Sequence, residues 1–406
     1  MSGPGDAAGA QPPDGFAELL PGEAACHRRV EDLLLGSFRR WGYDEVITPS
    51  CEHYHTLAGT CGEEAFKFVD HRGRILALRP DVTPSIARLA ATRLAGVSPL
   101  RLCYRAQVFR SQQQEGWHEW GQAGAELVGP GGPGADGEIL ALALQSLQEL
   151  GLDSFQAAVG HRGLLEALLE AAGLGHQGQA RALDALRRRD LVTLKSLLGS
   201  GSLLGKLVAH PARWSAGQLL PELENQLGGG TALMEIHAIF AMLEAAGLSH
   251  RAYLDLGLVR GPAYYTGMVF DIYAPPVRRA LGGGGRYDRL LQAFGSSRPA
   301  TGFSFDVPAL VQAVKEQCPL QAGGRDYYVV PVPGREQAAF ACAVRLRRRG
   351  YTVELALDPS GVENALAWAR DRGFARVLLV GNSENSEVVL ASMSRPPGQG
   401  RPAGIH

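Results

Sequence analysis

Apolar residues near the start of the chain recur at helical spacing, and the pattern then changes to the alternation that is typical of strands. Val30, Leu34 and Phe38 lie four residues apart on one face of a predicted helix, and Gly42 follows as its C-cap. The pattern therefore predicts, in chain order, a helix over 19–41, a strand over 43–49, a hairpin over 66–78 and a helix over 83–94.

Two longer alternating runs follow, over Leu100–Phe109 and Trp117–Val128. The polar stretch Ser111–Gly116 separates them, which predicts an antiparallel hairpin with a long loop. A glycine-rich connection over 129–137 then leads into a predicted helix over 138–150.

The next region, about 161–247, is helical in pattern and is rich in Leu, Ala and Arg. The run Arg187–Arg189 fits a solvated helix face better than a nucleic-acid patch. Strand patterns resume over 253–258, 268–273 and 302–305, and Gly282–Gly285 is predicted to be a turn. The sequence therefore predicts that residues 16–318 form an antiparallel α+β domain that carries a helical insertion.

A short polar segment, 319–326, is predicted to be a linker. Beyond it the order strand, helix, strand, helix, strand over 327–395 predicts a small α/β domain with a parallel sheet. The Gly- and Pro-rich ends, 1–15 and 396–406, are predicted to be a disordered tail and a frayed tail.

Charge and cysteine content narrow the class of protein. Forty basic residues against 41 acidic ones leave a net charge of −1, which argues against nucleic-acid binding through bulk electrostatics. No apolar run approaches the roughly 18–20 residues that span a bilayer, so we expect no membrane partner. The N-terminal residues have no signal-peptide pattern, and the six scattered cysteines indicate reduced thiols. Together these features predict a cytoplasmic protein.

One segment has metal-ligand residue types. Cys51, His53, His55 and Cys61 lie close together in the chain, but their spacing matches no zinc module. Ordinary surface polar residues explain the segment better, so we predict no metal and no other cofactor.

Two segments carry candidate binding chemistry in the first half of the chain. Asp81 and Thr83 lie just before a predicted helix, where either could be only the N-cap. On the second run of the hairpin, Gln122 and Glu126 are four residues apart and so share a face, with Gly124 between them. The missing side chain at Gly124 would leave room for a small ligand whose ammonium or imidazole N–H reaches Glu126. A salt bridge from Arg110 to Glu126 is the structural alternative.

A third segment begins at Leu258. Arg260 could offer its guanidinium to a carboxylate or phosphate, and Tyr264 and Tyr265 supply ring surfaces and hydroxyls. The glycines of 282–285 would allow a ligand to approach the backbone, although a flexible turn needs them equally.

Taken together, these segments resemble those of histidyl-tRNA synthetase, a class II aminoacyl-tRNA synthetase, over about residues 17–315 and more weakly over 326–395. The following segments look like family motifs and fall in family order: Arg79–Thr83, Tyr104–Arg110, Gln122–Glu126, Leu258–Tyr265 and Gly284–Asp288. The resemblance implies a class II-type antiparallel sheet flanked by helices, with an anticodon-binding-like C-terminal domain. It also implies a histidine-binding-like pocket made of Asp81, Thr83, Arg110, Gln122, Glu126, Arg260, Tyr264 and Tyr265.

The departures from the synthetase pattern fall on the side that would bind ATP. Ala309 stands where the third class II motif has an arginine that holds the γ-phosphate, and Asp306 stands in place of a glycine. Losing one such cation costs on the order of 2–4 kcal/mol of transition-state stabilisation. Ala263 replaces an aspartate, and the glutamine-rich loop 111–117 lacks basic residues. The resemblance therefore implies no catalytic residues.

A synthetase-like body without synthetase chemistry is similar to the HisZ family, the regulatory subunits of ATP phosphoribosyltransferase in histidine biosynthesis. This resemblance implies a class II-type dimer within a hetero-oligomer, such as an octamer, with the short catalytic subunit HisG as partner and with histidine as a possible ligand. The retained pocket would then be a histidine sensor or a vestige. The alternatives are a working histidyl-tRNA synthetase, or another synthetase-like protein that binds tRNA or an amino acid.

Overall fold

The computed structural model describes residues 11–114, 116–199, 202–205, 216–259, 265–317, 325–357, 362–381 and 386–389. The chain divides into two compact units, residues 1–320 and 321–406, and each is described by itself.

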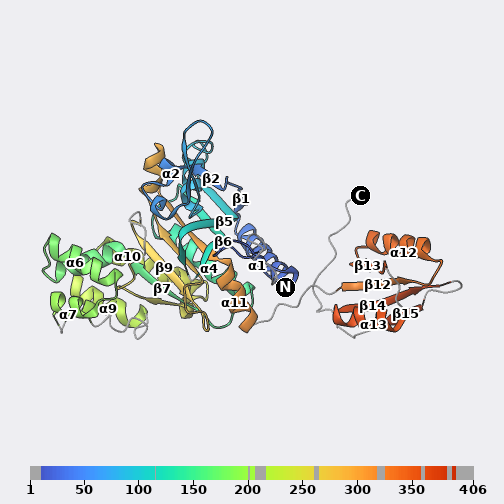
Figure 1. The fold of residues 1–406 in the computed structure, drawn as a ribbon. Helices are drawn as coiled ribbons and strands as arrows, with labels where there is room; N and C mark the ends of the chain where they lie inside the picture. The colour runs from blue at the N-terminus through green and yellow to red at the C-terminus, as the bar shows by residue number, and fades with distance from the viewer. Residues whose placement is uncertain are drawn as a thin grey trace, which may run out of the picture. The chain divides into compact units, whose positions relative to one another are not determined.

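The first unit is built on an eight-stranded sheet in the order β1-β5-β6-β11-β10-β9-β7-β8 (Figure 1). All of its strand pairs are antiparallel except β1 with β5 and β7 with β8. Its strands, in spatial order, are Asp44–Glu45 (β1), Leu100–Gln114 (β5), Trp117–Val128 (β6), Ala300–Asp306 (β11), Gly282–Arg286 (β10), Met268–Tyr273 (β9), Gln156–His161 (β7) and Ala252–Leu254 (β8).

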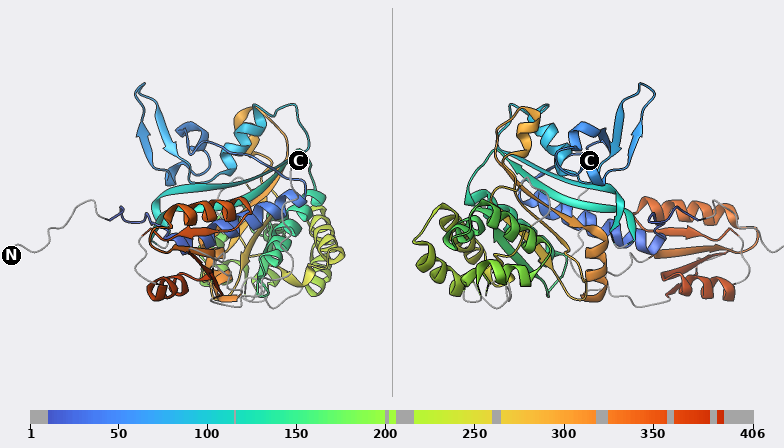
Figure 2. Two further views of the ribbon diagram at one scale, coloured as in Figure 1. Left: turned by 90° about the vertical axis from the view of Figure 1, so that its right-hand side faces the viewer. Right: turned by 60° about the vertical axis from the view of Figure 1, so that its left-hand side comes forward.

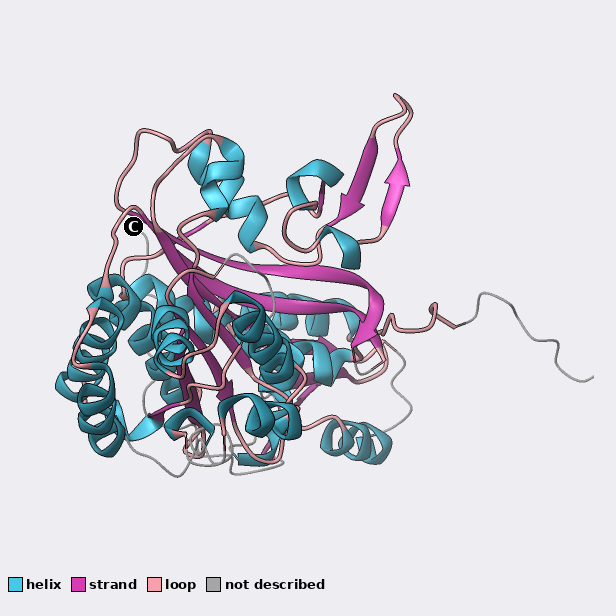
Figure 3. Cartoon of the chain, turned by 90° about the vertical axis from the view of Figure 1, so that its left-hand side faces the viewer, coloured by secondary structure: helices cyan, strands magenta, loops and turns pink. Residues whose placement is uncertain are grey.

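Three long helices pack on one face of this sheet: Pro21–Arg40 (α1), Pro133–Glu149 (α4) and Val307–Gln317 (α11) (Figure 3). In α1 the apolar stripe predicted from the sequence is buried, with Val30, Leu34 and Phe38 all at 0% exposure. The other face is covered only in part, by Thr83–Ala91 (α3) and the 3-10 turn Leu290–Phe294 (η4). The uncovered part of this second face holds the candidate site.

A small three-stranded sheet precedes α3. It contains Cys51–His53 (β2), Lys67–Val69 (β3) and Ile75–Leu78 (β4), with the short helix Tyr54–Leu57 (α2) and the 3-10 turn Gly62–Glu64 (η1) between β2 and β3. The β3–β4 hairpin projects from the body of the unit (Figure 2). Both this hairpin and the β5–β6 hairpin confirm the pairing predicted from the sequence.

A group of helices follows β7 and ends before β8. It comprises Arg162–Ala171 (α5), His176–Arg187 (α6), Leu191–Leu198 (α7), Ala216–Leu227 (α9) and Thr231–Ala245 (α10), with the 3-10 turn Ser249–Arg251 (η3) after them. His161, at the end of β7, ties this group to the sheet because its Nε2 lies 3.0 Å from Glu235 Oε2 on α10.

Four element predictions were wrong, and one of them is the strand expected over 253–258, because strand β8 ends at Leu254. Gly282–Gly285 is strand β10 and not a turn, because its neighbours β9 and β11 come too close for side chains: a Cβ on Gly284 would lie 2.0 Å from the Gly302 carbonyl oxygen. Helix α4 begins at Pro133, inside the expected glycine-rich connection, and Gly137 on this helix leaves space for Met242 of α10. Only Asp44–Glu45 of the strand expected over 43–49 pairs with the sheet.

The second unit has a four-stranded sheet in the order β13-β12-β14-β15. Its elements are Arg325–Pro331 (β12), Glu336–Arg348 (α12), Val353–Leu355 (β13), Val362–Asp371 (α13), Phe374–Val380 (β14) and Ser386–Val389 (β15). The first three strands are parallel, as predicted, and β15 adds an antiparallel edge. Two apolar clusters, one on each face of the sheet, pack against α12 and α13. Most of the segment expected to be the linker lies outside the described residues.

Candidate functional site

The turn before α3 is fixed by a buried arginine. Arg79 is 4% exposed, and its guanidinium donates to the carbonyl oxygens of Thr48 (2.8 Å) and Gln107 (2.9 Å). These bonds tie the turn to strand β5 and to the segment that follows β1. Arg79 therefore positions the two residues that follow it in the motif and is not itself free to hold a ligand.

Asp81 and Thr83 have different roles in this turn. Asp81 Oδ1 accepts a hydrogen bond from the Thr83 backbone N–H at 3.1 Å, so Asp81 satisfies one of the unpaired donors at the start of α3. Thr83 does not cap the helix with its side chain. Its hydroxyl donates to Glu126 Oε1 at 2.8 Å, across to strand β6. The capping alternative thus applies to Asp81 and not to Thr83.

Glu126 is the most deeply buried polar group of the site. It is 0% exposed, and its second oxygen, Oε2, accepts a hydrogen bond from the Tyr287 hydroxyl. Burial raises the pKa of Glu126 to about 8, and the neighbouring charge of Asp81 adds to this while the two hydrogen bonds oppose it. The carboxylate fits because the facing residue on β11 is Gly302, where a Cβ would lie 1.7 Å from Glu126 Oε2.

The alternative salt bridge between Arg110 and Glu126 does not form. Arg110 instead pairs with Glu64 at 3.1 Å and donates to the Pro80 carbonyl oxygen at 3.3 Å. Its guanidinium also lies 5.0 Å from the centre of the Trp120 ring. Arg110 therefore lies beside the turn before α3 but outside the Thr83–Glu126–Tyr287 cluster.

The expectation that Gly124 leaves space for a ligand was wrong. Tyr104, which faces Gly124 across the hairpin, fills that space: a Cβ on Gly124 would lie 2.6 Å from the Tyr104 hydroxyl oxygen. Tyr104 is 1% exposed, and burial raises its pKa well above the ordinary value. The glycine is needed for this close approach of an aromatic ring.

Gln122 shares the face of β6 that carries Glu126, as the alternation predicts. It is 7% exposed, and its buried Oε1 accepts no hydrogen bond from the residues that the structure describes. A buried amide oxygen without a donor costs about 1–3 kcal/mol, so this atom is a natural acceptor for a ligand N–H.

Of the three candidate side chains in the third predicted segment, Tyr265 falls within the described residues, and Arg260 and Tyr264 lie outside them. Tyr265 is half-buried and packs on the same side of the sheet as Tyr104 and Tyr287. Its ring comes close to β10, since a Cβ on Gly285 would lie 3.1 Å from Tyr265 Cδ1.

Sequence reasoning missed three residues of this site: Arg79, Tyr104 and Tyr287. All three stand inside the motifs quoted above, but the motifs alone do not say which side chains turn inward. The hairpin register could have identified Tyr104, because it places a tyrosine opposite a glycine. Tyr287 reaches Glu126 only through the pairing of β10 with β11, and the glycine run had concealed that strand.

The far end of β11 differs from a phosphate site. Asp306 accepts from the Ala309 backbone N–H at 2.8 Å, which caps α11, and it pairs with Arg279 at 3.0 Å. Ala309 is 0% exposed within the core formed by α1, α4 and the sheet. The first turn of α11 therefore presents a helix cap and an apolar contact at this position.

Metal sites and membrane-spanning helices are the two remaining possibilities that the sequence raised. No group of three or more His, Cys, Asp or Glu side chains in that part of the chain is arranged to hold a metal ion. In the segment with metal-ligand residue types, Glu52 pairs with Arg88 at 2.7 Å, and burial raises the pKa of Cys61 to about 12. Among the helices described here, none is both long and apolar enough to cross a membrane.

The fold and the buried cluster define a protein of the histidyl-tRNA synthetase type. Residues 15–310 match the family described as histidyl-tRNA synthetase. The histidyl-tRNA synthetase of Nostoc sp. PCC 7120 superposes with a TM-score of 0.80 over 94% of this chain and 97% of that one, and at 17% identity this likeness concerns the fold.

Within this class, the chain belongs to the family of ATP phosphoribosyltransferase regulatory subunits. It is 41% identical to the regulatory subunit of Symbiobacterium thermophilum, over 91% of this chain and 97% of that protein. The corresponding protein of Moorella thermoacetica is 40% identical, over 89% of this chain and 96% of that one. A crystal structure from Bacillus halodurans, described as an ATP phosphoribosyltransferase regulatory subunit/histidyl-tRNA synthetase, has a TM-score of 0.80 at 30% identity over 92% of this chain and 99% of that one.

Proposed function

We propose that this chain makes no chemical step itself, and that it acts in the cytoplasm as a histidine-responsive regulatory subunit of a separate catalytic subunit of ATP phosphoribosyltransferase. One contrast carries the proposal. The polar cluster around Glu126 is complete and holds a free buried acceptor at Gln122, whereas the first turn of α11 presents the buried Ala309.

The ligand of the Glu126 pocket, in this proposal, is histidine. Its ammonium group would find acceptors in Gln122 Oε1, Asp81 and Thr83, and an imidazole N–H would be accepted by Glu126. Because Glu126 has a pKa of about 8, a ligand N–H that favours the ionised carboxylate would displace its proton at pH 7. Histidine binding should therefore release protons, which calorimetry in buffers of different ionisation enthalpy can measure.

The binding test compares two carboxylate variants by isothermal titration calorimetry. Glu126→Gln keeps the shape but removes the charge, and we expect it to weaken histidine binding by about tenfold to a hundredfold, the worth of a charge-assisted hydrogen bond. Glu18→Gln, at an exposed carboxylate outside the pocket, should bind histidine like the unmodified protein. If both variants bind with the affinity of the unmodified protein, histidine does not use this pocket.

The regulatory role has its own test. Mixed with a short catalytic subunit, the chain should raise the rate of phosphoribosyl-ATP formation and make that rate sensitive to histidine. Alone with histidine and ATP, it should give no pyrophosphate exchange. Measurable exchange would favour the alternative of a working synthetase, and a rate that is unaffected by this chain would overturn the regulatory role.

We also propose that the chain self-associates into a dimer within the hetero-oligomer. Exposed apolar side chains occur after β1 and on the projecting hairpin: Ile47 is 90% exposed, Val69 65% and Ile75 54%. Such exposure is typical of an interaction surface. In light scattering, the double variant Ile47→Glu, Val69→Glu should lower the oligomeric mass, whereas Val192→Glu, at an equally exposed apolar residue of α7, should not.

A further inference from the structure

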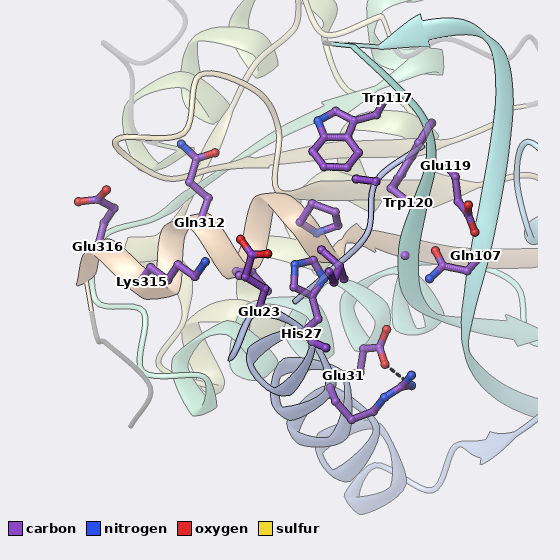
Figure 4. A pocket seen from close by; sticks show the side chains of 17 residues that line it. Glu23, His27, Glu31, Gln107, Trp117, Glu119, Trp120, Gln312, Lys315 and Glu316 are labelled. Atoms are coloured by element: carbon purple, nitrogen blue, oxygen red, sulfur yellow. Dashed lines mark hydrogen bonds and ion pairs between the residues drawn. The ribbon is translucent and has the colours of Figure 1, made fainter. Parts of the chain in front are cut away.

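A pocket lies at the β5–β6 hairpin (Figure 4), on the face of β6 opposite the one that carries Glu126. Its volume is about 400 Å³, and it is an open pocket lined by α1, α11, the hairpin and the segment before α1. Gly121 lines this pocket, and a Cβ at that position would point into it, 3.4 Å from Glu31 Oε1. The next residue, Gln122, points to the other face of strand β6, so this pocket is separate from the Glu126 cluster.

Carboxylates from three elements line this pocket. Glu23 and Glu31 come from α1, Glu119 from β6 and Glu316 from α11. They are opposed by two cations, Arg28 and Lys315, and Arg28 is already paired with Glu31 Oε2 at 2.7 Å. Burial, with Lys315 nearby, lowers the pKa of His27, so that its ring is neutral at pH 7. The pocket is therefore net negative, which repels phosphates and favours a cation.

Two of these carboxylates keep unused acceptor capacity. Glu31 is only 8% exposed, yet its Oε1 accepts no hydrogen bond from a described residue. Glu119 has no hydrogen-bond or ion-pair partner in the part of the chain that the structure describes. Both side chains keep contact with solvent at the pocket, so their free lone pairs can accept N–H bonds from a ligand in place of water. Burial raises the pKa of both carboxyls, in keeping with this.

Gln107 and Gln312 add amide groups to the lining, and part of the remaining wall is apolar. Trp117 is half-buried at the hairpin, and Leu19, Pro308 and Val311 contribute aliphatic surface. An indole ring offers a stacking surface for a flat ring and attracts cations through its face. A ligand that fills such a pocket combines a flat ring with a positively charged donor group.

We propose that this pocket binds a small aromatic amine, with its ammonium group on the carboxylates of Glu31 and Glu119 and its ring against Trp117. The proposal does not rest on the regulatory function. It predicts a site separate from the Glu126 cluster, because Gly121 and Glu126 lie on opposite faces of strand β6.

The experiment titrates the full chain by calorimetry with two probes of the same ring and similar length. Tryptamine carries an ammonium group and indole-3-propionate a carboxylate. We expect tryptamine to bind at least tenfold more tightly, and saturating histidine to leave its affinity unchanged. Glu119→Gln should weaken tryptamine at least fivefold, and Gly121→Leu should abolish binding by filling the pocket. Glu18→Gln is the matched carboxylate control and should change nothing.

Three results would overturn the proposal: equal affinity for the two probes, competition between tryptamine and histidine, or full affinity in Glu119→Gln. The Glu119 variant keeps the test decisive even if Gly121→Leu fails to fold, because residue 119 is half-exposed and the change is nearly isosteric. The circular dichroism melting temperature of each variant confirms that it is folded.

Discussion

The two ends of strand β11 have different surroundings. Near its start, Gly302 leaves space for the buried Glu126 carboxylate, which Thr83 and Tyr287 hold in place. At its other end, Asp306 caps α11 and Ala309 is buried in the core. One strand can therefore carry a buried polar cluster at one end and a helix cap with an apolar contact at the other, because each depends on a few side chains and neither is needed to pair the sheet.

The Glu126 end of β11 lowers the free energy of unfolding at neutral pH, and the Ala309 end does not. A fully buried carboxyl with a pKa of about 8 destabilises the fold at neutral pH relative to an uncharged residue of the same shape. The end at Ala309 has the composition of an ordinary core and carries no such cost. A costly group is better explained by ligand binding than by stability, which supports a sensor over a vestige.

The strongest way to break the comparison is to return the missing cation to α11. Ala309→Arg would place a charged side chain at a position that is 0% exposed and surrounded by apolar residues. We expect the free energy of unfolding to fall by about 3–5 kcal/mol, since a buried charge would lack a partner. Urea denaturation followed by circular dichroism measures this.

The matched control for that change lies on the same helix. Gln312→Arg introduces the same side chain at an exposed position of α11, and it should change stability by less than about 0.5 kcal/mol. If Ala309→Arg is as stable as Gln312→Arg and gains pyrophosphate exchange, then this end of β11 has kept a phosphate site after all.

The next prediction concerns pH and the Glu126 end. Between about pH 4.5 and 8 the folded protein keeps the Glu126 proton whereas the unfolded chain releases it. The free energy of unfolding should therefore decrease as the pH rises through this window, by up to about 1.4 kcal/mol per pH unit from this group. Glu126→Gln should remove that slope, so its advantage over the unmodified protein grows from pH 5 to pH 8.

Urea midpoints measured at half-unit pH steps would give both profiles. Glu18→Gln, an exposed carboxylate, should follow the unmodified protein throughout. Parallel profiles for Glu126→Gln and the unmodified protein would mean that Glu126 ionises normally in the fold, and the energetic contrast between the two ends of β11 would disappear.

The sequence predicted which residues of a strand share a face, but it did not predict which side chains meet in the site. Alternation over Trp117–Val128 placed Gln122 and Glu126 on one face without any structure, since a strand has a fixed period. The partners of Glu126 could not be found in this way, because Thr83 is 43 residues away and Tyr287 is 161 residues away. The glycine run was misread because glycine serves turns and close strand contacts equally, and only the pairing of β10 with both neighbours distinguishes the two.

The smallest predicted effect concerns the hairpin that separates the two pockets. The expected disordered tail includes a packed residue: the Gly15 carbonyl oxygen accepts from the His118 backbone N–H at 2.7 Å. Next to it, the ring of Phe16 lies 5.7 Å from that of His118 and 6.1 Å from that of Phe66. Phe16→Ala removes these ring contacts and should cost about 1 kcal/mol, with faster hydrogen exchange at the His118 amide. Hydrogen exchange at the buried amides of β11 should not change in this variant. The control variant Glu18→Gln should leave the exchange rate at the His118 amide unchanged. An unchanged exchange rate at the His118 amide would mean that the contacts of Phe16 do not stabilise the β5–β6 hairpin.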